Sequence, residues 1–260
     1  MASNAHAVDL DRLNTLTKYP SIPTYHALDP SNGSLLEEAV AFSGPVLLTE
    51  KVDGTNARIA HLPDGTVLIG SRNEWLHALG DLVANPGLGI VDAVRPLAER
   101  IATSPAPPAD AVVTVYGEVY GGKVTGASAQ YTGSRAVGFR LFDVAVVDAL
   151  ADRLRQPAAA LSEWRESGGP LFLDEGALRA EADRLGVALT PRLGTVDAAD
   201  LPRSVADADA FLKRELPETH VALDEGAGGQ PEGVVLRSVD RAAIAKARLG
   251  DYRRTLRRRS

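Results

Sequence analysis

Lys51 stands within a run of charged and small residues, Glu50–Arg58, that could support nucleophilic chemistry. An unprotonated lysine amine attacks carbonyl carbon or phosphorus. At its ordinary pKa of about 10.4 lysine is almost wholly protonated at neutral pH, and nearby cations or partial burial lower that pKa. Lys246 and Arg248 are candidates for those cations, and they would also bind the phosphates of an anionic substrate. These residue types indicate a reactive lysine that acts on a phosphorylated compound.

Carboxylate and aromatic side chains elsewhere in the chain could complete such a site. Glu118 and Glu232 could orient a divalent metal ion or a ribose hydroxyl, since Mg²⁺ usually binds through a few carboxylates together with substrate phosphates. Either Phe139 or Phe142 could stack on a base. Strand alternation places these two rings on opposite faces, so we expect at most one of them to stack, and we favour Phe142.

The elements that must position these residues can be read from the apolar pattern. Lys51 lies where a strand gives way to a tight bend containing Gly54. Apolar and β-branched runs predict strands at 45–48, 67–69, 111–120, 139–147 and 232–237. Apolar periodicity and capping residues predict helices at 34–40, about 86–102, 174–186 and 204–216. The helix-rich stretch of about 150–222 is expected to be an insertion, because the β pattern resumes after it.

Composition excludes several classes of protein. Hydrophobic residues make up 45% of the chain, as expected of a globular protein with a core. No apolar run approaches the roughly 20 residues of a membrane span, and the first residues lack the pattern of a secretory signal. The chain has no cysteine, which excludes disulfides and thiolate metal sites. We therefore expect a cytoplasmic enzyme without a membrane partner.

Sequence motifs for competing chemistry are missing. The chain has no Gly-x-x-x-x-Gly-Lys-Ser/Thr phosphate loop and no Gly-x-Gly-x-x-Gly after a predicted strand. It has no Gly-x-Ser-x-Gly elbow, and its histidines lack metal-ligand spacing. The reactive lysine is thus the one chemistry that the sequence suggests.

Charge is distributed unevenly along the chain. The formal net charge is −6, which argues against a general nucleic-acid coat protein. The end of the chain is nevertheless rich in arginine, including Arg253 and Arg254. We predict that the basic tail at 249–260 forms a local site for a polyanion, and the alternative is a solvated, frayed tail.

The residues singled out above belong to short motifs that occur in a fixed order. The motifs are Lys51–Asn56, Ser71–Asn73, Tyr116–Val119, Phe139–Asp143, Glu232–Arg237 and Lys246–Arg248, preceded by Lys18–Ile22. In order and spacing they resemble the covalent nucleotidyltransferase superfamily of ATP-dependent polynucleotide ligases and mRNA capping enzymes. Within it, the chain is most similar to RNA ligases of the phage and kinetoplastid-editing type.

The resemblance implies a fold and a division of the chain. The implied fold class is α+β, a nucleotidyltransferase (adenylation) domain with antiparallel β-sheets flanked by helices, ATP-grasp-like. We expect a lead-in at 1–45, the nucleotidyltransferase domain at 46–248 with its helical insertion, and the basic tail at 249–260. Many relatives carry a further C-terminal domain that helps to hold nucleic acid, so a protein partner could take that place here.

The resemblance also assigns roles to single residues. Lys51 is the nucleophile that becomes AMP-lysine, with Lys246 and Arg248 as further catalytic residues. Glu232 is implied to bind the metal, which is Mg²⁺ or, alternatively, Mn²⁺. The residues implied to bind ATP are Glu50, Asn56, Arg72, Glu118, Phe142, Glu232 and Lys246. The residues expected to bind RNA are Tyr19, Arg253 and Arg254.

The implied activity is ATP-dependent joining of RNA ends. Lys51 would attack the α-phosphorus of ATP, the AMP would pass to a 5′-phosphate end, and a 3′-hydroxyl would then displace AMP. Asn56 stands where DNA ligases and capping enzymes usually carry arginine, which favours RNA as the substrate. Arg248 replaces the lysine that ends the last motif and keeps its charge, without the compact ammonium group. The alternatives are a DNA ligase and a stand-alone adenylyltransferase that does not complete ligation.

Overall fold

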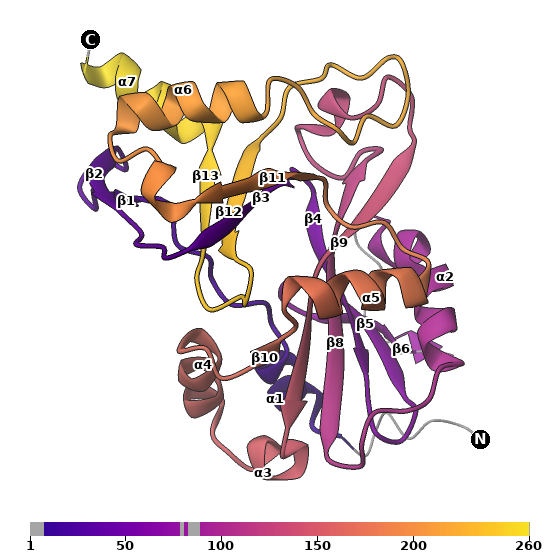
Figure 1. Ribbon diagram of the computed structural model, residues 1–260. Coiled ribbons are helices and arrows are strands. Elements are labelled where there is room, and N and C mark those ends of the chain that lie inside the picture. Colours follow the sequence, from indigo (N-terminus) through magenta and orange to yellow (C-terminus); the bar gives the residue numbers. More distant parts are fainter. Residues whose placement is uncertain (1–7, 79–80, 83–88, 260) are drawn as a thin grey trace. The chain divides into compact units, whose positions relative to one another are not determined.

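The computed structural model describes residues 8–78, 81–82 and 89–259, which fall into two compact units (Figure 1). Unit 1 consists of Met1–Ser21, Gly54–Val124 and Val137–Leu189. Unit 2 consists of Ile22–Asp53, Thr125–Ala136 and Thr190–Ser260. The run that contains Lys51 therefore contributes to both units: its first residues end a strand of unit 2, and its last residues begin a strand of unit 1.

Unit 1 is built on an antiparallel sheet with the strand order β10-β9-β8-β4-β5-β6-β7. Its strands are β4 (Thr55–His61), β5 (Val67–Ser71), β6 (Trp75–Ala78), β7 (Asp81–Leu82), β8 (Ala111–Gly121), β9 (Val137–Asp148) and β10 (Leu171–Phe172). Its helices are α1 (Leu10–Leu16), α2 (Ile90–Ala102), α3 (Leu150–Leu154), α4 (Ala158–Glu166) and α5 (Glu175–Leu185).

Helices cover both faces of the unit 1 sheet with apolar side chains. The buried residues of α2 recur at three- and four-residue spacing, and Val94 lies with Leu178 of α5 in one core cluster. On the other face, Leu13 of α1 and Leu161 of α4 lie in a second cluster with Leu68 of β5. The long strands β8 and β9 thus have an apolar layer on each side, which explains why both read as strongly β in the sequence.

Unit 2 contains a smaller antiparallel sheet, β11-β3-β12-β13, and a β1-β2 hairpin. Its strands are β1 (His26–Leu28), β2 (Leu35–Ala39), β3 (Pro45–Lys51), β11 (Arg192–Asp197), β12 (Gly233–Ser238) and β13 (Ile244–Arg248). Its helices are α6 (Val205–Glu215) and α7 (Leu249–Arg259), with short 3₁₀ turns η2 (Ser128–Gln130) and η3 (Ala198–Asp200).

The core of unit 2 lies between one face of its sheet and the helices α6 and α7, which run side by side in Figure 1. Leu48 of β3 and Leu212 of α6 belong to this core together with Tyr252 of α7. His26 of β1 is buried against α7, with Nδ1 2.8 Å from the Tyr252 hydroxyl. Helix α7 is therefore a structural part of unit 2.

Several predicted elements are confirmed and others need correction. The strands predicted at 111–120, 139–147 and 232–237 and the helices at 174–186 and 204–216 correspond to β8, β9, β12, α5 and α6. The helix predicted at 34–40 is wrong, because Leu35–Ala39 pairs with β1 as strand β2. The predicted helix at 86–102 begins at Ile90 where it is described, and residues 86–88 lie outside the described residues.

Two predicted regions have a different organisation from the one that the sequence suggested. The stretch of about 150–222 is divided between the units, because β10 joins the sheet of unit 1 and β11 joins that of unit 2. Residues 249–259 form helix α7, since Tyr252 and Thr255 supply a buried face that a frayed tail would lack. None of the described helices combines the length and apolar character needed to cross a lipid bilayer.

The packing of α7 can be tested with Tyr252→Ala, which removes a side chain that is 1% exposed. We expect the free energy of unfolding to fall by about 3 kcal/mol or more, measured by denaturant titration, because a large buried ring is lost. Arg253→Ala changes an exposed side chain on the same helix and should alter stability by less than about 0.5 kcal/mol. Equal losses in both variants would contradict this packing.

Candidate active site

Lys51 and Glu232 form an ion pair at the end of the β3–β12 ladder. The Lys51 Nζ donates to Glu232 Oε2 at 2.6 Å, and the two side chains are 26% and 17% exposed. Antiparallel pairing sets Lys51 opposite Gly233, which brings the preceding residue, Glu232, beside the amine. A Cβ at Gly233 would overlap the carbonyl oxygen of Ala247 on β13, so only glycine allows this close approach of strands.

Burial changes the proton affinity of Glu232. Desolvation raises the pKa of the Glu232 carboxyl above its ordinary value, and the nearby Lys51 ammonium offsets this only in part. A carboxylate with a raised pKa accepts a proton more readily than an exposed one does. The pair therefore places the Lys51 amine within hydrogen-bond reach of a proton acceptor.

The register of the unit 2 sheet gathers its cations on one face. Gly233 of β12 lies opposite Lys51 of β3 on one side and opposite Arg248 of β13 on the other. Lys246 lies two residues before Arg248 on β13, opposite Val235. Residues two apart on a strand share a face, so the three predicted basic residues lie on the same side. The intervening residues, such as Ala247, enter the core on the other side.

Glu50 points away from that face and is buried, at 1% exposure. Its Oε1 accepts a hydrogen bond from the Thr219 hydroxyl, and its Oε2 accepts one from the His220 N–H at 2.8 Å. The structure thus places Glu50 where it holds residues 219–220 against the strand that carries Lys51. This tether depends on a long-range contact, which the sequence did not reveal.

A second tether holds the bend after Lys51. The Asp53 N–H donates to the hydroxyl of Tyr131, at 2.7 Å, and the Tyr131 carbonyl accepts from Leu223 N–H, also at 2.7 Å. Tyr131 is fully buried, and burial raises the pKa of its phenol. Segments 125–136 and 219–230 therefore support the lysine run together.

Asp224 fastens these two segments to each other. Its carboxylate accepts from the hydroxyls of Thr132 and Ser134, and from the N–H groups of Gly133 at 2.7 Å and Gly226 at 3.0 Å. These donors, with the Thr132 hydroxyl first, hold the pKa of Asp224 far below its ordinary range. No motif in the sequence marks this residue, because three of its four partners, Thr132, Gly133 and Ser134, lie about ninety positions away.

Unit 1 carries Asn56 and Glu118 as direct cross-strand partners on β4 and β8. Their side chains share one face of the sheet, and Asn56 Oδ1 is buried without a hydrogen-bond partner among the described residues. A Cβ at Gly54 would overlap the carbonyl oxygen of Val119, so the motif glycine allows the chain to lie against β8. The buried amide oxygen beside a carboxylate is suited to a ligand with hydroxyl or amino donors.

The arginines of unit 1 have different surroundings. Arg72 is exposed at the turn between β5 and β6, where the Ser71 hydroxyl accepts from the N–H groups of Asn73 and Glu74. Arg58 is fully buried, donates to Asn14, and lies 4.1 Å from the centre of the Trp75 ring. Arg58 is therefore an internal structural cation, although it belongs to the same run as Lys51.

The two candidate stacking rings lie on different sides of β9. Phe142 is the extra residue where the β8–β9 register shifts, and its ring centre lies 5.0 Å from that of Tyr19 in an edge-on contact. The Tyr19 hydroxyl donates to Asp143 Oδ2 at 2.8 Å. Phe139 packs partly against the α2 core and lies over Gly117, where a Cβ would overlap its ring. The expected opposite placement of the two rings is thus confirmed.

Most arginines of α7 hold the β1–β2 hairpin. Arg254 donates to Asp251 Oδ1 at 2.9 Å and to the Gly33 carbonyl oxygen at 3.3 Å. Arg258 donates to the Asn32 carbonyl oxygen at 2.8 Å, and Arg259 donates to Glu37. Arg253 forms no ion pair within the described residues and lines a hollow of unit 2 beside Glu232.

The described residues contain no cluster of three or more His, Asp or Glu side chains that could enclose a metal ion. Glu232 lines a hollow with several cations, and the other carboxylate of that wall, Asp251, is engaged by Arg248 and Arg254. This arrangement fits a Mg²⁺ ion bound by one protein carboxylate and by the phosphates of a nucleotide, as is usual for that metal.

Comparisons with known proteins agree on one family. The model of the family described as RNA ligase matches residues 44–248, which reach from just before β3 to the end of β13. No curated protein matches the chain. The fold is similar to solved structures of RNA ligase from Naegleria gruberi.

Three mutant forms of that ligase illustrate the likeness. One, with ATP and Mn, has a TM-score of 0.56 at 14% identity and covers 93% of this chain and 62% of its own. Another with ATP and Mn scores 0.54 at 15% identity, covering 81% and 50%. A third, with AMP and Mn, scores 0.53 at 14% identity, covering 90% and 62%. The chain thus spans about half to three fifths of these structures, and the expected α+β fold with antiparallel sheets is confirmed.

The role of Asp224 gives a prediction with a defined sign. Because its pKa is lower in the folded protein than in the unfolded chain, it stabilises the fold above pH of about 4 and loses this contribution as the pH falls below that value. Asp224→Asn should unfold at lower denaturant concentration at pH 7 and should lose less stability than the parent protein between pH 5 and about 3.

The measurement is the denaturation midpoint at each pH. Glu225→Gln is a matched control, because it removes a neighbouring exposed carboxylate, and its pH profile should follow that of the parent protein. If Asp224→Asn and the parent lose stability in parallel on acidification, the carboxylate does not fasten the two segments.

Proposed function

Since the chain belongs to the RNA ligase family, we propose that it is an ATP-dependent RNA ligase that joins 5′-phosphate and 3′-hydroxyl ends. The observation that carries this proposal is the Lys51–Glu232 pair, in which the amine lies 2.6 Å from a carboxylate of raised pKa. Lys246 and Arg248 on the same sheet face supply positive charge for phosphate groups. The solved relatives with ATP or AMP and Mn support a nucleotide and a divalent metal as ligands.

In the first step Lys51 Nζ forms a bond to the α-phosphorus of ATP. The bond from that phosphorus to the oxygen of the β-phosphate breaks, and pyrophosphate leaves. The proton released from Nζ passes to Glu232, whose burial raises its proton affinity. A bound Mg²⁺ or Mn²⁺, held by Glu232 and the phosphates, would neutralise the charge that develops on phosphate oxygens.

The next two steps transfer the AMP and then displace it. A 5′-phosphate oxygen of RNA attacks the phosphorus of lysyl-AMP, and the Lys51 amine leaves as Glu232 returns the proton to Nζ, which gives an adenylated RNA end. A 3′-hydroxyl then attacks the 5′-phosphorus and loses its proton to water, a phosphodiester forms and AMP departs. Lys246 and Arg248 stabilise the negative charge on the phosphates during these transfers.

Residues of unit 1 take part in nucleotide binding in this proposal. Asn56 Oδ1 is buried without a described partner, so it can accept from a ligand, and Glu118 beside it is proposed to contact the ribose. Arg72 is exposed and is proposed to contact a phosphate. Phe142 remains our choice for the base contact, with Phe139 as the alternative. Glu50, with both oxygens engaged, acts chiefly by positioning the lysine strand.

The proposed function predicts a covalent intermediate. Incubation with α-labelled ATP and Mg²⁺ should give an acid-stable labelled protein, and Lys51→Ala should abolish the label because the phosphorus then has no acceptor. Glu232→Gln should slow labelling by about 100-fold or more, since a proton acceptor and a metal ligand are lost together.

Lys123→Ala changes an exposed lysine outside the site, so this variant serves as the control and should label normally. Persistent labelling of Lys51→Ala, or no labelling with any nucleoside triphosphate, would refute the mechanism.

The proposed function also predicts which nucleic acid is joined. Sealing of matched 5′-phosphorylated substrates, analysed by denaturing electrophoresis, should favour an RNA 3′-hydroxyl strand over DNA by roughly tenfold or more, because the 2′-hydroxyl offers contacts that DNA lacks. Preference for an all-DNA nick would support the DNA ligase alternative. Labelling without the joining of any strand, even with pre-adenylated RNA, would support a stand-alone adenylyltransferase.

A further inference from the structure

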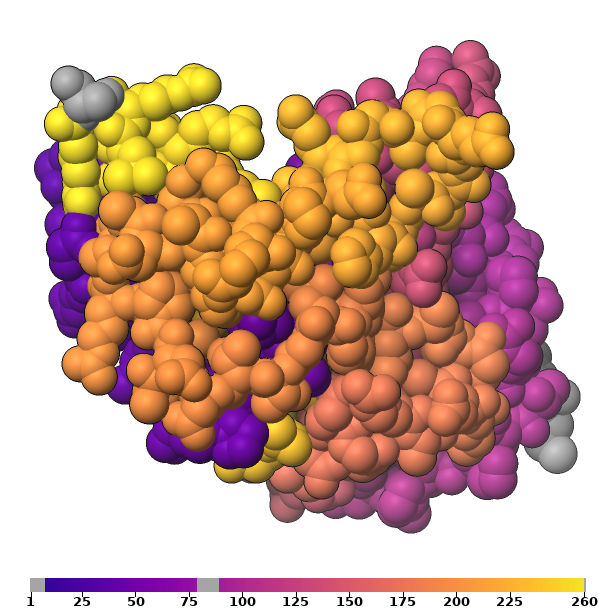
Figure 2. Space-filling model, turned by 45° about the horizontal axis from the view of Figure 1, so that its top comes forward, coloured from indigo at the N-terminus to yellow at the C-terminus, as the bar shows by residue number. Residues whose placement is uncertain are grey.

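A hollow of about 610 Å³ in unit 2 lies beside the Lys51–Glu232 pair, between α6, α7 and the segment that leads into β12. Figure 2 shows it where the yellow atoms of α7 face the light-orange atoms of the segment before β12. Glu232 forms part of its wall, so the hollow adjoins the predicted reaction centre. Its size is that of a ligand pocket.

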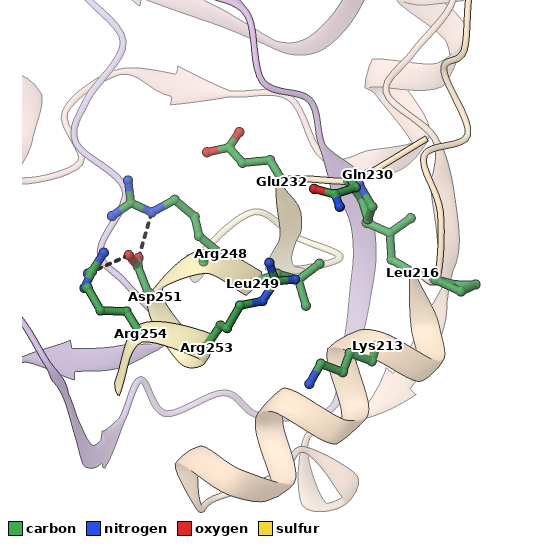
Figure 3. Close-up of a pocket in the computed structure, with 12 residues that line it drawn as sticks. Lys213, Leu216, Gln230, Glu232, Arg248, Leu249, Asp251, Arg253 and Arg254 are labelled. Carbon is green, nitrogen blue, oxygen red and sulfur yellow. Dashed lines mark hydrogen bonds and ion pairs between the residues drawn. The ribbon is translucent and has the colours of Figure 1, made fainter. Parts of the chain in front are cut away.

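Cations from three elements line this hollow (Figure 3). Lys213 comes from α6, Arg248 from β13, and Arg253 and Arg254 from α7. In Figure 3 the side chains of Arg253 and Lys213 extend into the same space from opposite elements. The first turn of α7 also forms part of the wall, which adds the positive end of that helix.

Acidic residues pair with three of these cations, and Arg253 is the exception. Lys213 Nζ lies 2.5 Å from Asp209 Oδ2 one turn earlier on α6, and its side chain remains 57% exposed. Asp251 is 5% exposed and accepts from Arg248 at 2.8 Å and from Arg254 at 2.9 Å, so one inward carboxylate holds two guanidinium groups. Glu232 is paired with Lys51. Arg253 has no ion pair within the described part of the chain, and its charge faces the hollow without a counterion. The site is therefore preorganised for an anion.

The lining chemistry selects phosphate over a base or a sugar. The described residues of the wall include no aromatic side chain on which a base could stack, while arginine and lysine are the usual ligands of phosphate oxygens. Two sources of phosphate are available to a ligase, the pyrophosphate part of ATP and the backbone of the RNA strand. Arg253 and Lys213 extend the cationic surface away from the Lys51–Glu232 pair. A nucleic-acid strand carries successive phosphates, so it can use cations that are spread over such a surface.

We propose that this hollow binds the backbone phosphates of the RNA strand whose end is joined, with Lys213 and Arg253 as its principal contacts. The proposal rests on the ligase function inferred above and adds to it a residue, Lys213, from a helix outside every motif. The chain has a net charge of −6, so a local site of this kind is needed to retain a polyanion.

The test measures RNA binding and lysine labelling on the same preparations. A fluorescent 5′-phosphorylated single-stranded RNA is titrated by anisotropy at several salt concentrations with the full chain and with Lys213→Gln/Arg253→Gln. We expect binding to weaken roughly tenfold or more and the slope of log affinity against log salt to fall by about 0.7 for each lost phosphate contact. Arg155→Gln changes an exposed arginine directly after α3, removes a charge from unit 1 and should leave the RNA affinity unaltered.

Each other outcome has a defined meaning. Intact RNA binding in the double variant, combined with a higher ATP requirement for labelling, would assign the hollow to ATP and overturn the proposal. Loss of neither property would also overturn it. If the parent chain binds RNA through this hollow but forms no lysyl-AMP, the ligase function fails while the binding site stands. A circular dichroism melt confirms that the variants are folded.

Discussion

The pairing of β3 with β12 is the constraint on which the candidate site depends. It is an antiparallel ladder in the middle of the small sheet, so its register cannot slip without moving Leu48 and Leu236 out of the core. The same register fixes Lys51 opposite Gly233 and beside Glu232. Hydrophobic burial on one face thus sets the geometry of a charged pair on the other, because core residues of the ladder fix where the Lys51 amine lies.

The surrounding loops extend this control beyond the sheet. Glu50 and Asp53 flank the lysine in sequence, and each is bound to a segment far along the chain, one through Thr219 and the other through Tyr131. Asp224 then joins those segments to each other. The bend after Lys51 would otherwise be free to change conformation, and these three attachments reduce that freedom.

Local sequence patterns were sufficient to predict the secondary structure of elements whose burial is regular. They were insufficient where contacts with distant parts of the chain decide the conformation. The β runs of β8 and β9 were predictable because both faces are buried, and α5 and α6 because their caps and periodicity agree. The residues Leu35–Ala39 carry helical signals but pair with β1, because contacts with that strand and with the distant helices α6 and α7 decide their conformation. The order of α7 was hidden in the same way, because its arginines suggested solvent while Tyr252 provides the packing.

The site was predictable to a similar extent. Ordered motifs marked Lys51, Glu118, Glu232 and Lys246 as candidates, because the chemistry proposed for them would restrict the residue types there. They left no indication that Arg58 is a buried structural cation, nor that Lys213 reaches the hollow beside Glu232. Both depend on which distant element packs against them, and a motif carries no information on that.

The glycines of the motifs bear on what such patterns can prove about ancestry and activity. Gly54, Gly117 and Gly233 are each required because a backbone oxygen or an aromatic ring occupies the place of a side chain. Selection for folding alone would preserve them. A descendant that had lost its nucleophile and become a silent paralogue would keep this glycine pattern for as long as its sheets had to close. Under the proposed function, the amine and its carboxylate would distinguish working members of the family from inert ones, whereas the glycines would record only shared architecture.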